Sequence, residues 1–373
     1  MPPADGSADN ARYFPQLDGL RCYAVICVML SHFWLQGSMF GHLSVRLFFV
    51  LSGFLITGIL LDGRFAPSPV PFRKLAGTFY LRRALRLFPA YYLMLAIGAL
   101  LNVEGVRETL WWHATYLSNI WYARHPDWAP WTTVQLWTLS VEEQFYLIWP
   151  PLMLLLPRKL LLPALVATIA CGMVTRTLCE WIWPGMPPQD VLMPANVDAL
   201  AVGALVATIL RLHLPGEAGR HRLLRLFAWA SAASVALVPV AWAVPILFGL
   251  TDFLYVVPMA WLVLAARHGM RGPAAWLLEN RVARYLGRIS YGIYLWHLYA
   301  WVLLIWLVPQ YELLDIGPAT FVLTSLAAIT LSSASWHLVE LPFNRLKRLC
   351  PYGSGAFRGF GRFSWRTSAR KSP

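Results

Sequence analysis

Charged residues are scarce in this chain of 373 residues. Asp, Glu, Lys and Arg make up 13% of it, whereas hydrophobic residues make up 58%. A typical soluble domain has about a quarter of its residues charged, and the mean hydropathy here is +0.53. This composition excludes an ordinary soluble domain and is typical of a protein that crosses a membrane several times.

Cysteine is also scarce, and its spacing follows no pairing pattern. Four of the five cysteines lie within apolar runs and one in a basic tail: Cys22, Cys27, Cys171, Cys179 and Cys350. An odd number at these spacings gives neither a disulfide framework nor a zinc site. We therefore expect no metal.

Apolar runs near the length that crosses a bilayer occur ten times. They lie near residues 19–38, 43–61, 88–103, 136–156, 160–181, 196–211, 226–244, 250–267, 289–308 and 318–338. The first follows a polar N-terminus and contains Arg21, so we expect a span there and not a cleavable signal peptide. The sequence predicts an all-α, polytopic integral membrane protein with about ten transmembrane helices in residues 1–346. Residues 347–373 are expected to form a disordered basic tail that touches anionic lipid.

The basic residues outnumber the acidic ones, 31 against 18. Most of them lie in alternate connections between the apolar runs and in the tail, which is typical of a topology signal and not of nucleic-acid binding. By the positive-inside rule, both termini are cytoplasmic in a bacterial-type cytoplasmic (inner) membrane. Residues 72–87 mix basic and apolar positions at helical spacing, which indicates a helix lying on the cytoplasmic surface.

The longest outer connection, residues 104–135, is rich in Trp and Tyr and contains prolines. Such rings favour the boundary between water and lipid. A simple interfacial belt is the favoured interpretation. The alternative is a lid over the outer mouth whose rings stack on sugars.

The first apolar run carries two ionisable residues, Arg21 and His32. They lie eleven positions apart, which is close to three helical turns and roughly 16 Å of helix, so both side chains point to one side. Ionisable groups at membrane depth usually face a functional interior. A snorkelling arginine with a packed histidine explains the pair equally well.

Three further groupings place charges in or beside apolar runs. The cluster Arg82, Arg83 and Arg86 suits phosphate oxygens, those of lipid head groups or of a phosphorylated substrate. The adjacent Glu142 and Glu143 enter a span together, and each must find a partner or take up a proton. Asp198 lies near the start of its span. The favourable interaction of a carboxylate with a helix N-terminus explains its presence there equally well.

Two polar stripes lie on the last two apolar runs. Ser290, Tyr294 and His297 are spaced for one helix face, and a similar stripe joins Ser333, His337 and Glu340. Alone, each stripe is more typical of a seam of hydrogen bonds between helices. Together with the other groupings they supply acid, base and anion-binding groups, which favours an enclosed reaction chamber.

Seven segments follow one another along the chain: LDGLRCYAVICVMLSHF, RLFFVLSGFLIT, FYLRRALRLFPAYY, QLWTLSVEEQFYLIWP, DALAVGAL, RISYGIYLWH and VELPFNRL. Their order, from about residue 13 to 346, resembles the integral-membrane acyltransferase 3 family. The family's Arg-x10-His pair falls on Arg21 and His32. Its Arg-rich element falls on Arg82, Arg83 and Arg86, and its paired-Glu motif on Glu142 and Glu143.

The resemblance implies an O-acyltransferase. Members commonly move an acetyl or other acyl group from acyl-CoA to extracytoplasmic or lipid-linked glycans, and some acylate small molecules such as macrolides. Many carry an additional SGNH-type domain, which this sequence lacks. We therefore expect acyl-CoA as co-substrate with no bound cofactor, and membrane lipids and a glycan or lipid-linked sugar as partners. The sequence indicates no particular protein partner.

The resemblance also suggests roles for the site residues. His32 is expected to be the general base on the acceptor hydroxyl or a transient acyl carrier, with Arg21 holding its surroundings or stabilising the donor. Phosphate binding is expected of Arg82, Arg83 and Arg86, with Arg284 or Arg288. Glu143, and then Glu142, is expected to orient an imidazole or to bind the acceptor. Support or contact with the acceptor is expected of Asp198, Tyr294 and His297.

Two functions of other classes stay open. The same buried charges suit a proton-coupled transporter or flippase for glycan intermediates, although the inverted repeats typical of transporters are not evident. A catalytically silent membrane partner in a polysaccharide export complex is the second alternative.

Overall fold

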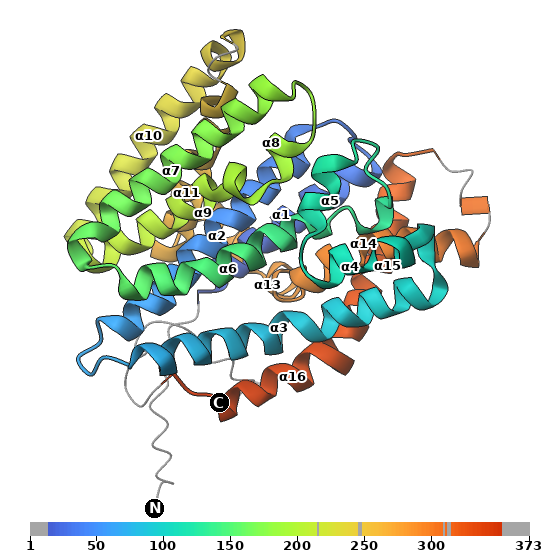
Figure 1. The fold of residues 1–373 in the computed structure, drawn as a ribbon, viewed down its shortest axis with the longest axis horizontal. Helices are drawn as coiled ribbons and strands as arrows, with labels where there is room; N and C mark the ends of the chain where they lie inside the picture. The colour runs from blue at the N-terminus through green and yellow to red at the C-terminus, as the bar shows by residue number, and fades with distance from the viewer. Residues whose placement is uncertain (1–13, 215, 245–247, 309, 312–314, 353–373) are drawn as a thin grey trace, which may run out of the picture.

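The computed structural model describes residues 14–214, 216–244, 248–308, 310–311 and 315–352. These residues form helices joined by short connections, and no strand occurs among them. Figure 1 shows α7, α10 and α11 grouped on one side, α4, α5, α14 and α15 on the other, and α3 with α16 along the lower edge. The prediction of an all-α chain is confirmed.

The elements follow one another in a simple order. The α-helices are α1 (Pro15–Phe33), α2 (Met39–Arg64), α3 (Phe72–Leu101), α4 (Val106–Ala114), α5 (Ser118–Arg124), α6 (Leu136–Leu155), α7 (Arg158–Ile182), α8 (Pro188–Val191), α9 (Met193–Thr208), α10 (Glu217–Ala243), α11 (Phe248–His268), α12 (Pro273–Glu279), α13 (Arg281–Arg288), α14 (Ser290–Leu307), α15 (Pro318–Ser335) and α16 (Leu341–Leu346). The 3₁₀ turns are η1 (Val103–Gly105), η2 (Trp131–Thr133) and η7 (Lys347–Leu349), and the π turns are η3 (Ile209–His213) and η6 (Trp336–Glu340).

Each of the ten predicted spans coincides with a helix. Within the described ranges, eight helices are long and apolar enough to cross a membrane, with α9 counted through η3 and α15 through to η7. The other two predicted spans are α1, which carries Arg21 and His32, and α6, which carries Glu142 and Glu143. The chain is a multi-pass membrane protein, and the predicted catalytic residues lie on α1 and α6.

These two helices lie between two apolar cores. The start of α1 and the middle of α6 pack with α2, α9 and α11. The end of α1 and the start of α6 pack with α3, α14 and α15. The polar side chains of α1 and α6 therefore face protein and not lipid, as expected for ionisable groups at membrane depth.

Glycine lets several backbones touch. A Cβ at Gly53 of α2 would lie 1.8 Å from the carbonyl oxygen of Leu200 in α9, and one at Gly203 would lie 2.1 Å from that of Val50. On α1, a Cβ at Gly19 would lie 2.3 Å from the carbonyl oxygen of Leu278. Small residues allow such close helix crossings in membranes, so α1 and α2 are held directly against their neighbours.

Residues 72–101 form one helix where the sequence predicted two segments. The expected surface helix at 72–87 and the expected span at 88–103 are continuous in α3, with Pro89 inside it. Proline is tolerated inside membrane helices when neighbouring groups satisfy the freed backbone. Close to Pro89, the Tyr291 hydroxyl donates to the carbonyl of Leu87 at 2.9 Å, which joins α3 to α14.

Residues 104–135, expected to be an outer connection, form a folded cap, and we call it the aromatic cap. Buried His113 is its centre, with ring nitrogens 2.8 Å from the Ser118 hydroxyl, 3.0 Å from that of Thr109 and 3.1 Å from that of Thr133. Burial lowers the pKa of His113 to about 4, so the ring is neutral at pH 7. Gln144 of α6 bonds to the Asn119 side chain, which joins the cap to a span. The segment is therefore a folded unit attached to α6, and stacking of its rings on sugars stays a prediction.

The predicted tail begins with residues that pack on α3. Arg82 donates to the carbonyls of Lys347 and Cys350 at 3.1 and 2.9 Å, and its guanidinium lies 4.9 Å from the Tyr352 ring centre. The rest of the tail, residues 353–373, lies outside the described residues.

Candidate active site

The two histidines singled out in the sequence meet inside the bundle. His32 lies at the end of α1 and His297 on α14, and Nδ1 of His32 is 2.9 Å from Nε2 of His297. Their rings are nearly parallel, with centroids 5.0 Å apart, and Trp131 of the aromatic cap lies beside His32. His32 therefore faces the interior, and its partner is an imidazole.

A backbone carbonyl sets the protonation of this pair. Nδ1 of His297 lies 2.7 Å from the carbonyl oxygen of Tyr294, which can only accept. Neutral imidazole has one donor and one acceptor nitrogen, so Nδ1 of His297 carries the proton and Nε2 accepts from Nδ1–H of His32. Nε2 of neutral His32 is left with a free lone pair, which is the form that a base or a nucleophile needs.

A cavity of about 310 Å³ opens beside His32. It is lined from α1, α2, the aromatic cap, α6, α8 and α14, and its aromatic walls include Trp128 and Trp137. Tyr294 also lines it, with its hydroxyl 2.7 Å from that of Thr138. Two predicted site residues, His32 and Tyr294, thus face one cavity, and His297 holds His32 from behind.

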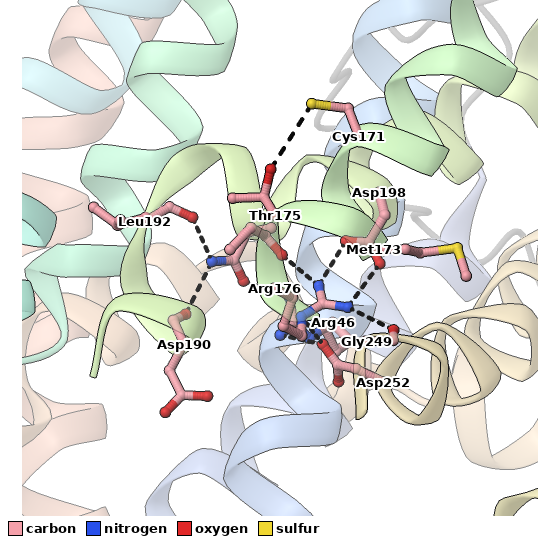
Figure 2. Close-up of polar contacts among 12 residues, drawn as sticks. Arg46, Cys171, Met173, Thr175, Arg176, Asp190, Leu192, Asp198, Gly249 and Asp252 are labelled. Atoms are coloured by element: carbon pink, nitrogen blue, oxygen red, sulfur yellow. Dashed lines mark hydrogen bonds and ion pairs between the residues drawn. The ribbon is translucent and has the colours of Figure 1, made fainter. Parts of the chain in front are cut away.

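One wall of the cavity is backed by a buried network of ion pairs, drawn in Figure 2. Arg46, which lines the cavity, is 2.5 Å from Asp252, and Asp252 is 3.0 Å from Nε of Arg176. Arg176 also forms two bonds to Asp198, at 2.9 and 3.1 Å. His42, a further lining residue, bonds to Asp252. The network holds α2, α7, α9 and α11 together behind the cavity.

Asp198 is fully buried in this network. Its carboxylate is taken up by Arg176 and does not line the cavity. The structure therefore places Asp198 inside the network, held by Arg176, and not at the cavity surface.

Arg46, Arg176, His42 and Asp252 were not among the predicted site residues. A signal for two of them is present in the sequence, because Arg46 and Arg176 are cations inside apolar runs, as Arg21 is. A cation at that depth requires a buried partner. The partner that Arg46 and Arg176 share, Asp252, comes from a different span, and no local sequence pattern identifies it.

The three arginines of α3 form no close ion pair with the described residues, although Glu142 and Glu143 lie near them. No carboxylate oxygen of the described residues lies within 4.0 Å of a nitrogen of Arg82, Arg83 or Arg86 in the ion pairs found. The Arg83 guanidinium lies 4.5 Å from the Tyr146 ring centre, and the charges of Arg21 and Arg83 act on Arg86. An excess of cations held this close is typical of a site for a multiply charged anion.

Glu142 and Glu143 lie at the arginine cluster and not at His32. Glu142 lies beside Ser52 and Tyr146, whose hydroxyls are 2.5 Å apart, and the charge of Arg83 acts on both glutamates. Oε1 of Glu143 is buried without a hydrogen-bond partner among the described residues. The imidazole at His32 is oriented by His297, whereas Glu143 faces the arginine cluster.

Two helices join the cavity to the arginine cluster. On α1, Arg21 pairs with Asp18 at 3.1 Å near Arg86, whereas His32 faces the cavity. At the start of α6, the N-cap residue Gln135 and Trp137 line the cavity, whereas Glu142 lies at the cluster. His32 at the cavity and Arg21 near the arginine cluster are thus roughly 16 Å apart along one helix.

Comparison with known proteins gives a consistent picture. The family model Acyl_transf_3, described as an acyltransferase domain, matches residues 14–366. YrhL of Bacillus subtilis is 31% identical over 369 residues, covering 89% of this chain and 55% of that protein. The peptidoglycan O-acetyltransferase OatA of Listeria monocytogenes is 28% identical over 372 residues, covering 90% of this chain and 56% of that protein. Nodulation protein 10 of Rhizobium leguminosarum bv. viciae is 26% identical over 382 residues, covering 88% of this chain and 93% of that protein.

The chain spans a little over half the length of the first two of these relatives. No solved structure matches it. Because the family model covers nearly all of its residues, and the Arg-x10-His, Arg-rich and paired-Glu motifs lie within that match, the chain belongs to the acyltransferase 3 family.

Proposed function

We propose that this protein is a membrane O-acyltransferase that moves an acetyl or other short acyl group from acyl-CoA to a hydroxyl of a cell-surface or lipid-linked glycan. The observation that carries the proposal is that His32, whose Nε2 holds the lone pair in the tautomer described above, lines a cavity on the same helix that reaches the arginine cluster at its other end. OatA is named as a peptidoglycan O-acetyltransferase, which supports a glycan acceptor.

The donor binds from the basic side in this proposal. Arg82, Arg83 and Arg86 receive the phosphates of CoA, because guanidinium groups bind phosphate oxygens in pairs. The pantetheine arm then extends along α1 and α6 toward His32. By the positive-inside rule this side is the cytoplasm of a bacterial-type cell, where acyl-CoA is made.

The chemistry follows from the protonation of the histidine pair. The acceptor hydroxyl attacks the thioester carbonyl and gives its proton to Nε2 of His32. The tetrahedral intermediate collapses, the carbon–sulfur bond breaks, and the leaving CoA sulfur takes up that proton. His297 accepts from Nδ1–H of His32 throughout and stabilises the imidazolium that forms.

Replacing His297 with Phe should lower kcat by roughly 10²- to 10⁴-fold, the range spanned by general-base contributions. The KM for acetyl-CoA should stay unchanged, because His297 is far from the arginine cluster along the helices. Phe removes the acceptor that holds His32 in its useful tautomer. Steady-state release of CoA by the purified protein in nanodiscs measures both constants.

The control is His297→Gln. Its amide can donate to the Tyr294 carbonyl and accept from His32, as the imidazole does, so it should recover most of the kcat that Phe loses. Equal rates for the Phe and Gln variants would contradict a positioning role for His297.

Replacing Arg82 and Arg86 together with Gln should raise the KM for acetyl-CoA by roughly 10- to 100-fold, since bonds to charged groups contribute about 1.5–3 kcal/mol. Added salt should raise the KM of the wild type as well, because ions screen the attraction. The rate at saturating acetyl-CoA should change little.

Arg73→Gln is the matched control, because Arg73 is an exposed residue of the same helix. Its KM should equal that of the wild type. An unchanged KM in the double variant would assign the cluster to lipid head groups instead.

Mass spectrometry of surface glycans and small metabolites, with and without the gene, tests the function itself. An acyl increment on a glycan that disappears with the gene supports the transferase, and one on a small molecule identifies the other acceptor class. Unmodified glycans whose export changes would support the transporter or the silent partner.

A further inference from the structure

The cavity beside His32 contains a buried acceptor without a donor. Gln135 is 2% exposed and lines the cavity. Its Nε2 donates to the carbonyl of Leu295 at 3.0 Å, which sets the orientation of the amide. Its Oε1 has no hydrogen-bond partner among the described residues. A buried acceptor left unpaired is costly, so this oxygen is placed to receive a bond from a ligand.

A second acceptor lines the same cavity from α8. The half-buried Asp190 accepts a bond from Asn196 through its backbone carbonyl, not through its carboxylate. Figure 2 shows that carboxylate directed away from the cluster of Arg46, Arg176 and Asp252. Burial raises the pKa of the Asp190 carboxyl despite the nearby charges of His42 and Arg46.

The remaining walls suit a sugar ring. Trp128 of the aromatic cap and Trp137 of α6 both line the cavity. Indole faces pack against the apolar C–H faces of pyranoses, whereas hydroxyl and amide groups at the ring edge need hydrogen-bond partners. A cavity of about 310 Å³ holds one such ring beside His32.

We infer that Gln135 Oε1 and the Asp190 carboxylate each accept a hydrogen bond from the acceptor, which is therefore a pyranose with at least two donor groups besides the reacting hydroxyl. Hydroxyls and acetamido N–H groups both qualify. A lipid alcohol with a single hydroxyl leaves both oxygens unpaired. This inference rests on the proposed function, because it assigns the acceptor side of the same site.

The test pairs protein variants with altered acceptors. Full-length protein in nanodiscs receives acetyl-CoA and methyl N-acetyl-β-glucosaminide, or analogues that each lack one hydroxyl or the acetamido group. Gln135→Met should lower kcat/KM by roughly 10- to 100-fold on the complete sugar. One analogue lacks the group that bonds to Gln135. With that analogue, the kcat/KM of the wild type should fall by the same factor, whereas the kcat/KM of Gln135→Met should be the same as on the complete sugar. Asp190→Leu should show the same coupling with a different analogue.

Gln135→Glu separates the acceptor from the structural bond. A protonated Glu can donate to Leu295 and keep the acceptor oxygen, so its kcat/KM should stay within a few-fold of the wild type. The inference is overturned if Gln135→Met and the wild type discriminate equally among all the analogues.

Measurements of sugar binding distinguish a failure of the pyranose site from a failure of the proposed transferase function. Stabilisation of the wild type by each sugar, without acetyl-CoA, is measured as a shift in Tm. Selective stabilisation without CoA release would sustain the pyranose site and contradict the transferase. If no sugar of the series stabilises the protein or promotes CoA release, the pyranose site is wrong. Transfer to other acceptors would then still sustain the transferase.

Discussion

Replacing His32 with Ala should lower acyl transfer by roughly 10²- to 10⁴-fold, because general-base catalysis contributes about that much. His32 lines the cavity, and its partner His297 leaves Nε2 as the free base. Alanine removes this nitrogen and opens space that water can fill. The measurement is CoA release by purified protein at saturating acetyl-CoA and glycan acceptor, with protein level and Tm recorded for each variant.

His213→Ala is the matched control, because His213 is exposed and lies in η3, away from the cavity lining. It should retain wild-type turnover. Normal turnover in a folded His32→Ala variant would remove His32 from the chemistry. A single turnover with labelled acetyl-CoA then separates the two roles of the wild type, since label bound to the protein would identify His32 as a carrier and not a base.

Replacing Arg176 with Met should lower the free energy of unfolding by roughly 3–5 kcal/mol, the usual cost of removing one partner of a buried ion pair. Arg176 is 2% exposed and bonds to Asp198, which is fully buried, as well as to Asp252. Its loss leaves two carboxylates in the interior with too little positive charge. Unfolding by SDS titration in mixed micelles measures the change.

Two further variants make the comparison sharp. Arg124→Met should change the free energy of unfolding by less than about 0.5 kcal/mol, because Arg124 is exposed on α5. Asp198→Asn should restore part of the stability when combined with Arg176→Met, since one uncompensated charge is then removed. A loss in Arg176→Met no greater than that in Arg124→Met would contradict the role of the network.

The helices could be predicted from the sequence because each apolar run is a local property. All ten predicted spans coincide with helices, and the charges of α1 and α6 indicated interior faces. The separation of a surface helix ending at residue 87 from a span beginning at residue 88 was wrong, because α3 continues through Pro89 as one helix. Local composition thus determines that a helix forms, whereas its neighbours determine where it ends.

The partners within the site could not be predicted in the same way. A polar stripe shows that Tyr294 and His297 share a face, but not that His32 lies opposite, 265 positions away. The stripe of Ser333, His337 and Glu340 also failed as a single face. The π turn Trp336–Glu340 changes the helical period, so Glu340 is buried and His337 is exposed. Such shifts depend on tertiary packing.

The glycine contacts of α1 and α2 bear on how material passes through this protein. A carrier that alternates its access rocks one group of helices against another, which needs side chains that can slide between them. Here Gly19 meets Leu278, Gly53 meets Leu200 and Gly203 meets Val50, all backbone against backbone. Displacing one helix along another would drive Cα atoms into carbonyl oxygens. These contacts oppose sliding of α1 against α12 and of α2 against α9, so we expect each of these two helix pairs to move as one unit.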